Sequence, residues 1–403
     1  IVFAETLGRD IVNLDPAESR FVTNLLGKSI SPSNFIGAGD WTGFYNNILS
    51  INTTIAGLSQ KPLTDSLSAQ QIAITRGFLN TYRAMELYNV WTLRGPNGTA
   101  FPLPNLTPSN AVGPILCQTS ALAEISAILD SAYTDLASAP ASTALPFTLP
   151  AGFSSNGDFT TAGAFAQVNR ALKGRADLYR GIINNDAAAY QSALTALNAS
   201  FVDASGDLTT GIYYTYNTAP NEQANPIGVN TIFLTQAVGD SVNPNDKRKS
   251  KIVDLRPDTV RAYSVFSTYT SPLASTANQT GNIPMLRNAE LVLLRAQAQI
   301  GLGNLAAATA DVNAVHMGEG GLPSYAPFTT ARTAIDSTLY EKRYSLLLTG
   351  AQRLVDLRSY GRLGSNGATY FAKERSTDVY QSALPIPQGE RDARNGSFAC
   401  TGT

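Results

Sequence analysis

The sequence has little of what most catalytic and metal sites need. Its 403 residues include one histidine and two cysteines, and the net charge at pH 7 is −1. So few imidazoles and thiols do not make a typical transition-metal site, and we expect no metal. Calcium held by Asp and loop carbonyls stays open, although no EF-hand spacing is visible. The balanced charge gives no electrostatic reason to bind nucleic acid.

Long hydrophobic runs are also missing. No stretch approaches ~18 uninterrupted apolar residues, so the sequence predicts no transmembrane helix. The two cysteines, Cys117 and Cys400, would form at most one disulfide. A bridge that ties the C-terminal tail to the body and a pair of free thiols remain alternatives.

What is present indicates a folded, mostly helical chain. Hydrophobic residues make up 43% of the sequence and charged residues 15%, which excludes disorder and supplies a large core. Apolar side chains recur at i, i+3, i+4 and i+7 in segments that pair as hairpins. Ala and Gly stand where two such helices would cross closely, and the hairpins approach the ~34-residue length of a tetratricopeptide unit. The predicted helices are 68–91, 119–137, 162–183, 187–197, 289–302 and 305–316.

Two segments, 212–216 and 229–234, have the β-branched and aromatic character of short strands. Loop-rich segments surround them. We therefore predict a mainly α fold, in which tetratricopeptide-like helical hairpins form a scaffold with a loop-rich face and a small mixed insertion. We expect a single domain over 1–403, with the scaffold at about 40–137, 162–200 and 284–362, the insertion at about 201–282 and a C-terminal tail at 363–403.

No catalytic motif stands out. A Ser-His-Asp or Cys-His arrangement would have to use His316, which ends a predicted helix, where an imidazole commonly caps carbonyls or packs. No pair of carboxylates has a spacing that marks a glycosidase. We identify no catalytic residue and expect neither enzyme activity nor a cofactor.

Charged residues occur within an otherwise apolar helical segment near the C-terminus. Glu341, Arg343, Arg353, Asp356 and Arg358 lie there. Because an unpaired buried charge costs several kcal/mol, we expect these side chains to pair with one another or with helix ends. Their predicted role is structural.

Most of the chain resembles the SusD/RagB family, and the resemblance is strongest after residue 281. The segment 284–298, with Arg287, Glu290 and Arg295, looks like the family's I-P-x-x-R-x-A-E-x-x-L-x-x-A-E-A helix. The segment 341–358 is similar to its E-R-R-x-E-L-x-x-E-G-x-R-x-x-D-L-x-R signature, and Leu384-Pro-Ile-Pro to its L-P-I-P closing motif. Gln297, which stands where the family has Glu, removes part of the usual charge network.

This resemblance implies a nutrient-binding lipoprotein on the surface of the bacterial outer membrane. Such a protein binds a glycan, an oligosaccharide or another small nutrient and delivers it to a SusC-like TonB-dependent transporter. It would be held by an N-terminal lipid anchor that precedes Ile1, since the family's lipid-bearing cysteine is not in the sequence. A helical-repeat interaction scaffold without a small ligand, and an all-helical glycan-active enzyme, are the alternatives.

Sugar recognition uses aromatic platforms together with groups that bind hydroxyls. The candidate ligand-binding residues are Trp41, Tyr45, Asn46, Tyr213, Tyr214 and Tyr216. Trp41 and Tyr45, four apart on a helix, are also spaced as core residues. In a strand, Tyr214 and Tyr216 share one side and Tyr213 faces the other.

Overall fold

The computed structural model describes residues 1–60, 63–102, 112–350, 352–363, 373–396 and 399–402. These residues form two compact units, each assembled from separate stretches of sequence. The first unit comprises 1–29, 150–157 and 203–382, and the second unit comprises 30–149, 158–202 and 383–403. The single domain expected from the sequence stays a prediction. None of the described helices is long and apolar enough to cross a membrane.

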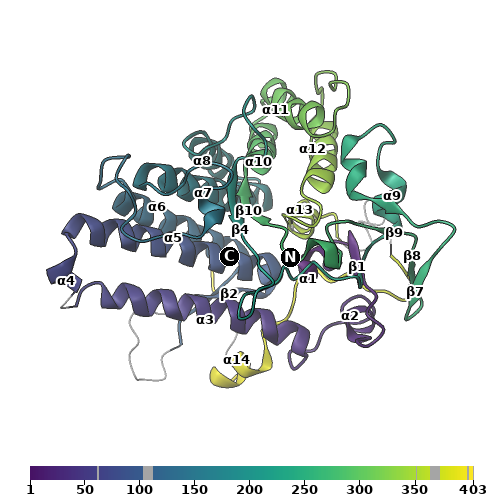
Figure 1. The fold of residues 1–403 in the computed structure, drawn as a ribbon, viewed down its shortest axis with the longest axis horizontal. Helices are drawn as coiled ribbons and strands as arrows, with labels where there is room; N and C mark the ends of the chain where they lie inside the picture. Colours follow the sequence, from purple (N-terminus) through teal and green to yellow (C-terminus); the bar gives the residue numbers. More distant parts are fainter. Residues whose placement is uncertain (61–62, 103–111, 351, 364–372, 397–398, 403) are drawn as a thin grey trace. The chain divides into compact units, whose positions relative to one another are not determined.

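The second unit is built from helices that pack in sequence order (Figure 1). Helix α3 packs on α5, α5 on α6, α6 on α7, and α7 on α8. The elements are α3 (Phe35–Gly57), α4 (Leu63–Ser66), α5 (Ala69–Arg94), η1 (Gly95–Asn97), β2 (Thr99–Ala100), β3 (Ile115–Leu116), α6 (Gln118–Leu136), α7 (Ala162–Asn184), α8 (Ala187–Asn198) and α14 (Gln388–Ala393). The four helices predicted at 68–91, 119–137, 162–183 and 187–197 are therefore confirmed.

Local sequence explains where these helices begin, end and cross. Ser68 and Gln71 form a reciprocal capping box at the start of α5. Asn185 ends α7 in the left-handed conformation, with φ of 50°, and the side chain of Asp186 caps α8. Gly174 allows the α7–α8 crossing, because a Cβ there would lie 2.5 Å from Leu197 Cγ.

The first unit combines small sheets with the C-terminal helices. Its elements are α1 (Val2–Leu7), β1 (Ile11–Asn13), α2 (Arg20–Thr23), η2 (Ala151–Phe153), β4 (Gly211–Tyr214), β5 (Ile232–Leu234), α9 (Gln236–Ser241), η3 (Lys247–Lys251), β6 (Val253–Asp254), β7 (Val260–Ala262), β8 (Val265–Ser267), β9 (Tyr269–Thr270), η4 (Thr276–Asn278), β10 (Ile283–Arg287), α10 (Asn288–Gly301), α11 (Leu305–Gly318), α12 (Ala331–Ser345) and α13 (Arg353–Ser359). Helix α10 packs on α11 and α12, and α12 packs on α13. The mainly α fold with a small mixed insertion is confirmed.

The sheets place the insertion against the helical part of this unit. Strands β1, β5, β9 and β6 form an antiparallel sheet in that order, so the N-terminal strand pairs with a strand of the insertion. The predicted strands at 212–216 and 229–234 correspond to β4 and β5. A buried cluster that includes Ile11, Ile232, Leu234, Tyr344 and Leu347 joins this sheet to α12.

The start of the C-terminal scaffold differs from the expectation. The predicted helices 289–302 and 305–316 correspond to α10 and α11, but the first residues of the motif 284–298, which resembles a helix of the family, form strand β10, so the helix begins at Asn288. Strand β10 pairs antiparallel with β4, and the register shifts between Pro284 and Leu286. Proline lacks the N–H that a helix interior needs, whereas a strand tolerates it at such an irregularity.

The tail is held by hydrogen bonds and a disulfide within the second unit. Parts of the predicted tail, 364–372, 397–398 and 403, lie outside the described residues. Leu384 N donates to Leu93 O at 2.8 Å, and Arg94 Nη1, on a fully buried side chain, donates to Pro385 O at 2.6 Å. The Leu-Pro-Ile-Pro motif thus fixes the tail to the end of α5.

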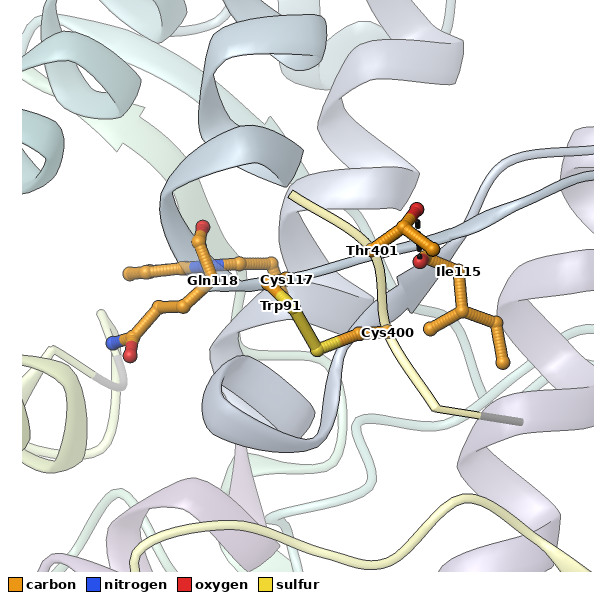
Figure 2. Close-up of a disulfide and its surroundings, with 6 residues drawn as sticks. All are labelled: Trp91, Ile115, Cys117, Gln118, Cys400 and Thr401. Atoms are coloured by element: carbon orange, nitrogen blue, oxygen red, sulfur yellow. Dashed lines mark hydrogen bonds between the residues drawn. A yellow bond between two sulfur atoms is a disulfide. The ribbon is translucent and has the colours of Figure 1, made fainter. Parts of the chain in front are cut away.

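Figure 2 shows the second attachment of the tail, a disulfide between Cys117 and Cys400. On either side of it, Cys117 N donates to Thr401 O at 2.9 Å and Thr401 N donates to Ile115 O at 2.8 Å. Cys117 is also the N-cap residue of α6. The bridge therefore links the tail to the start of a core helix.

Candidate functional site

Trp41 and Tyr45 lie together on α3, but Trp41 is not an exposed platform. Its side chain is 7% exposed and packs in a cluster with Val90 and Ile386. The Tyr45 ring is 4.4 Å from the Trp41 ring, and its hydroxyl donates to Ala100 O at 2.7 Å. Asn46 is exposed. The positions of the two rings favour the core interpretation of this pair.

Tyr213, Tyr214 and Tyr216 belong to the first unit, whereas Trp41 belongs to the second unit. Tyr213 is buried, and its hydroxyl donates to Thr209 O. Tyr214 and Tyr216 are half-buried and pack against the cluster that joins the sheet to α12. The alternation expected of a strand holds, since Tyr214 and Tyr216 share that cluster.

The charged residues of the C-terminal helices form buried pairs within the first unit. Asp10 lies 2.8 Å from Arg343 Nε and 3.0 Å from Arg353 Nε. Lys342 Nζ lies 2.7 Å from Asp356. Other contacts of the charged residues include Arg287 with Glu319 and the Ser345 carbonyl, Arg295 with Asp311, and Arg358 with the Ser382 carbonyl. Glu290 is buried as well.

These pairs hold distant segments together. Asp10 follows α1 and is 333 residues before Arg343, so two arginines of the C-terminal helices anchor the N-terminal segment. Gln297, which replaces an expected Glu, donates to Asp356 at 3.1 Å and accepts from Lys342 Nζ at 3.0 Å. The amide thus takes part in the network that the missing carboxylate would have joined.

A hollow of about 670 Å³ opens in the first unit, where α11 and α12 meet the segment that follows α9. Figure 1 shows α12 between α11 and α9. The hollow is lined by Ser241, Val242, Asn243, Pro244, His316, Leu322, Pro323, Tyr325 and Tyr340. Its volume falls in the range of small-molecule sites, about 300–1,000 Å³. Another cavity in this unit, beside Asp10, holds about 10 Å³, roughly one water.

A buried ion network lies behind the aromatic wall of the hollow. Glu341, with no exposed surface, contacts Arg248 at 2.7 Å and His316 Nδ1 at 2.8 Å. The Tyr325 hydroxyl donates to the same carboxylate at 3.0 Å, and the Tyr325 ring stacks on His316 with centroids 3.9 Å apart. The packing interpretation of His316 is confirmed, with a carboxylate and a ring as its partners.

Tyr340 is held by the segment that follows α9. Its hydroxyl donates to Asp246 at 3.1 Å and accepts from Asn243 N at 3.0 Å. Burial, together with the Asp246 charge, raises the pKa of Tyr340 to about 12. Burial and the charge of Glu341 raise the pKa of Tyr325 as well. Both phenols therefore stay neutral donors at physiological pH.

The acidic side chains around the hollow are engaged in structural contacts. The two buried carboxylates already have partners, and no group of three His, Cys, Asp or Glu side chains that could hold a metal occurs among the described residues. Tyr325 and Tyr340 were not named from the sequence, because Tyr325 lies in an irregular Pro-containing segment and Tyr340 in an ordinary amphipathic helix. The sequence offered one indication of Tyr325, which is that it follows soon after the only histidine, His316.

Sequence comparison alone gives no relatives. No family model matches the chain, and no curated protein matches it.

Structural comparison finds the same fold in solved structures. A SusD superfamily protein from Bacteroides vulgatus has a TM-score of 0.69 at 16% identity, over 99% of this chain and 92% of that one. Surface glycan-binding protein A from Bacteroides uniformis has a TM-score of 0.67 at 15% identity, over 98% and 92%. A laminarin-binding SusD-like protein has a TM-score of 0.66 at 17% identity, over 97% and 92%. The chain has the SusD-like fold across nearly its whole length.

Proposed function

We propose that this protein is a SusD/RagB-type surface lipoprotein of the bacterial outer membrane that binds a glycan and delivers it to a SusC-like TonB-dependent transporter. The observation that carries the proposal is the near-complete structural match to glycan-binding proteins. The motifs at 284–298, 341–358 and 384–387 agree with it. The aromatic hollow supplies a site of suitable size, and its carboxylates are occupied in structural contacts.

The binding step can be tested on the purified chain. Calorimetry and thermal unfolding are measured against panels of oligosaccharides and peptides, and each ligand is analysed afterwards for cleavage. We expect saturable binding and a raised melting temperature with one glycan class, since a ligand that binds only the folded state stabilises it. Cleavage of the ligand would favour the enzyme alternative. Absence of binding to every member of the panels would favour the interaction scaffold without a small ligand.

The site is tested separately from the function. Tyr340→Ala should weaken glycan binding, because it removes one wall of the hollow. Tyr214→Ala and Trp41→Ala test the two groups named from the sequence. We expect Trp41→Ala to lower stability by about 3–5 kcal/mol, as loss of a buried aromatic side chain does. Delivery is tested by cross-linking the lipidated protein on cells to a TonB-dependent transporter.

A further inference from the structure

His316 is placed to do more than pack. It lies in the last turn of α11, its side chain is 7% exposed, and it lines the hollow. One face of its ring is covered by Tyr325. The histidine therefore has a fixed position in the wall of the hollow.

The contact with Glu341 determines which ring nitrogen carries hydrogen. Glu341 pairs with Arg248 at 2.7 Å and accepts from the Tyr325 hydroxyl at 3.0 Å, so its oxygens take hydrogen bonds from the neighbouring donors. A carboxylate accepts hydrogen bonds, so His316 Nδ1, 2.8 Å away, is the donating nitrogen. In the neutral imidazole, Nε2 is then an acceptor.

Nε2 has no hydrogen-bond partner among the described residues, whereas Nδ1 is engaged. The other described residues of the lining contribute aromatic rings, prolines, aliphatic groups, a serine and an asparagine. None of them is Lys, Arg, Asp or Glu. The hollow thus offers stacking surfaces and the acceptor His316 Nε2, with no Lys, Arg, Asp or Glu among its described lining residues.

We propose that His316 Nε2 accepts a hydrogen bond from a hydroxyl of the bound sugar, and that the hollow selects neutral oligosaccharides over those that carry carboxylate or sulfate groups. This rests on the proposed function. The aromatic walls contact the apolar faces of the sugar rings, and the histidine recognises a hydroxyl. None of the described lining residues would give an anionic sugar a cationic partner in return for the hydration that it loses.

The single histidine makes a direct test practicable. Protein labelled with ¹⁵N-histidine gives the resonances of one imidazole. We expect the spectrum of the free protein to show hydrogen on Nδ1 and none on Nε2. Saturation with a neutral oligosaccharide from gluco-, manno- and xylo-series panels should shift the Nε2 resonance. Hydrogen on Nε2 in the free protein would overturn the proposal.

Two variants separate the acceptor from the packing. His316→Asn keeps an N–H near Glu341 but has no atom at the Nε2 position, and should weaken binding about 2- to 12-fold, the range for one neutral hydrogen bond. His316→Gln reaches the Nε2 position with an amide and should recover part of that loss. Met317→Ala, at the exposed neighbour, is the matched control and should leave affinity unchanged. Thermal unfolding shows that each variant is folded.

The outcomes distinguish this inference from the proposed function. If a sugar binds but neither the Nε2 resonance nor the His316→Asn affinity changes, the proposed function stands and the role of His316 is wrong. If uronic or sulfated oligosaccharides bind more tightly than neutral ones, the selectivity is wrong. If no sugar binds at all, the proposed function fails, and this inference fails with it.

Discussion

Removal of the disulfide by the double substitution Cys117→Ser and Cys400→Ser should destabilise the protein substantially. The bridge spans a sequence separation of 283 residues. The loop-entropy relation gives about 5–6 kcal/mol for a loop of this length, and loss of native disulfides typically costs about 2–5 kcal/mol. We expect a loss of about 3–5 kcal/mol. At ~2.1 cal/mol/K per residue over 403 residues, this lowers the melting temperature by about 4–6 °C.

The assay is urea unfolding followed by circular dichroism, with calorimetry for the melting temperature. The wild type is measured oxidised and after reduction with thiol blocking, and both forms are compared with the double-serine variant. The reduced wild type and the variant should agree, because the backbone bonds from Thr401 to Cys117 and Ile115 remain in both. An unchanged urea midpoint and slope for the variant would refute the loop-closure reasoning.

Three further substitutions test the interior. Asp10→Asn should cost about 3–5 kcal/mol, because two buried guanidinium groups lose their shared carboxylate. Burial lowers the pKa of Lys251 to about 7, so between pH 7 and about 10 the unfolded chain binds a proton that the folded chain lacks. The free energy of unfolding should therefore rise with pH in this window, by up to a few kcal/mol. Lys251→Met should remove this dependence on pH. Gly77→Ala should cost about 1–3 kcal/mol, because its Cβ would lie 2.8 Å from Ala132 O at the α5–α6 crossing.

Each of these is measured by urea unfolding against a matched control. Asp254→Asn removes a partner of the exposed Arg256 and should change stability by less than about 1 kcal/mol. Gly43→Ala, on α3 with nothing within 4 Å of the new Cβ, should stabilise the protein by about 0.5–1 kcal/mol. The reasoning would be contradicted if Asp10→Asn lowered the free energy of unfolding no more than Asp254→Asn does. It would also be contradicted if Lys251→Met kept the pH dependence of stability, or if the two glycine substitutions had equal effects.

Local patterns in the sequence predicted most of the scaffold, because helices depend on near neighbours. The helices predicted at 162–183 and 187–197 and the small residues where they cross are examples. The strand β10 could not be predicted in this way, since its partner β4 ends at Tyr214, 69 residues before Ile283, where β10 begins. Likewise, the charges at 343 and 353 indicated buried pairs, but nothing nearby indicated Asp10 as the partner.

The candidate site was predicted less well for a related reason. Tyr325 and Tyr340 have unremarkable positions in the sequence, and the tertiary packing of α11 and α12 brings them to one hollow with His316. Trp41 and Tyr45 had the composition of a sugar platform, but their helical spacing equally suits a core, and the structure buries Trp41. Composition identifies aromatic residues, whereas exposure depends on the fold.

The division of the chain into two discontinuous units has a consequence for synthesis. The first unit needs residues up to 382, and the second unit needs 383–403. Neither unit can therefore be complete when the ribosome has made only the first half of the chain. The ion pairs of Asp10 cannot form until Arg343 and Arg353 have been synthesised. Late closure keeps apolar surface exposed for most of translation. A nascent chain of this design exposes apolar surface for longer than one whose domains follow each other along the sequence.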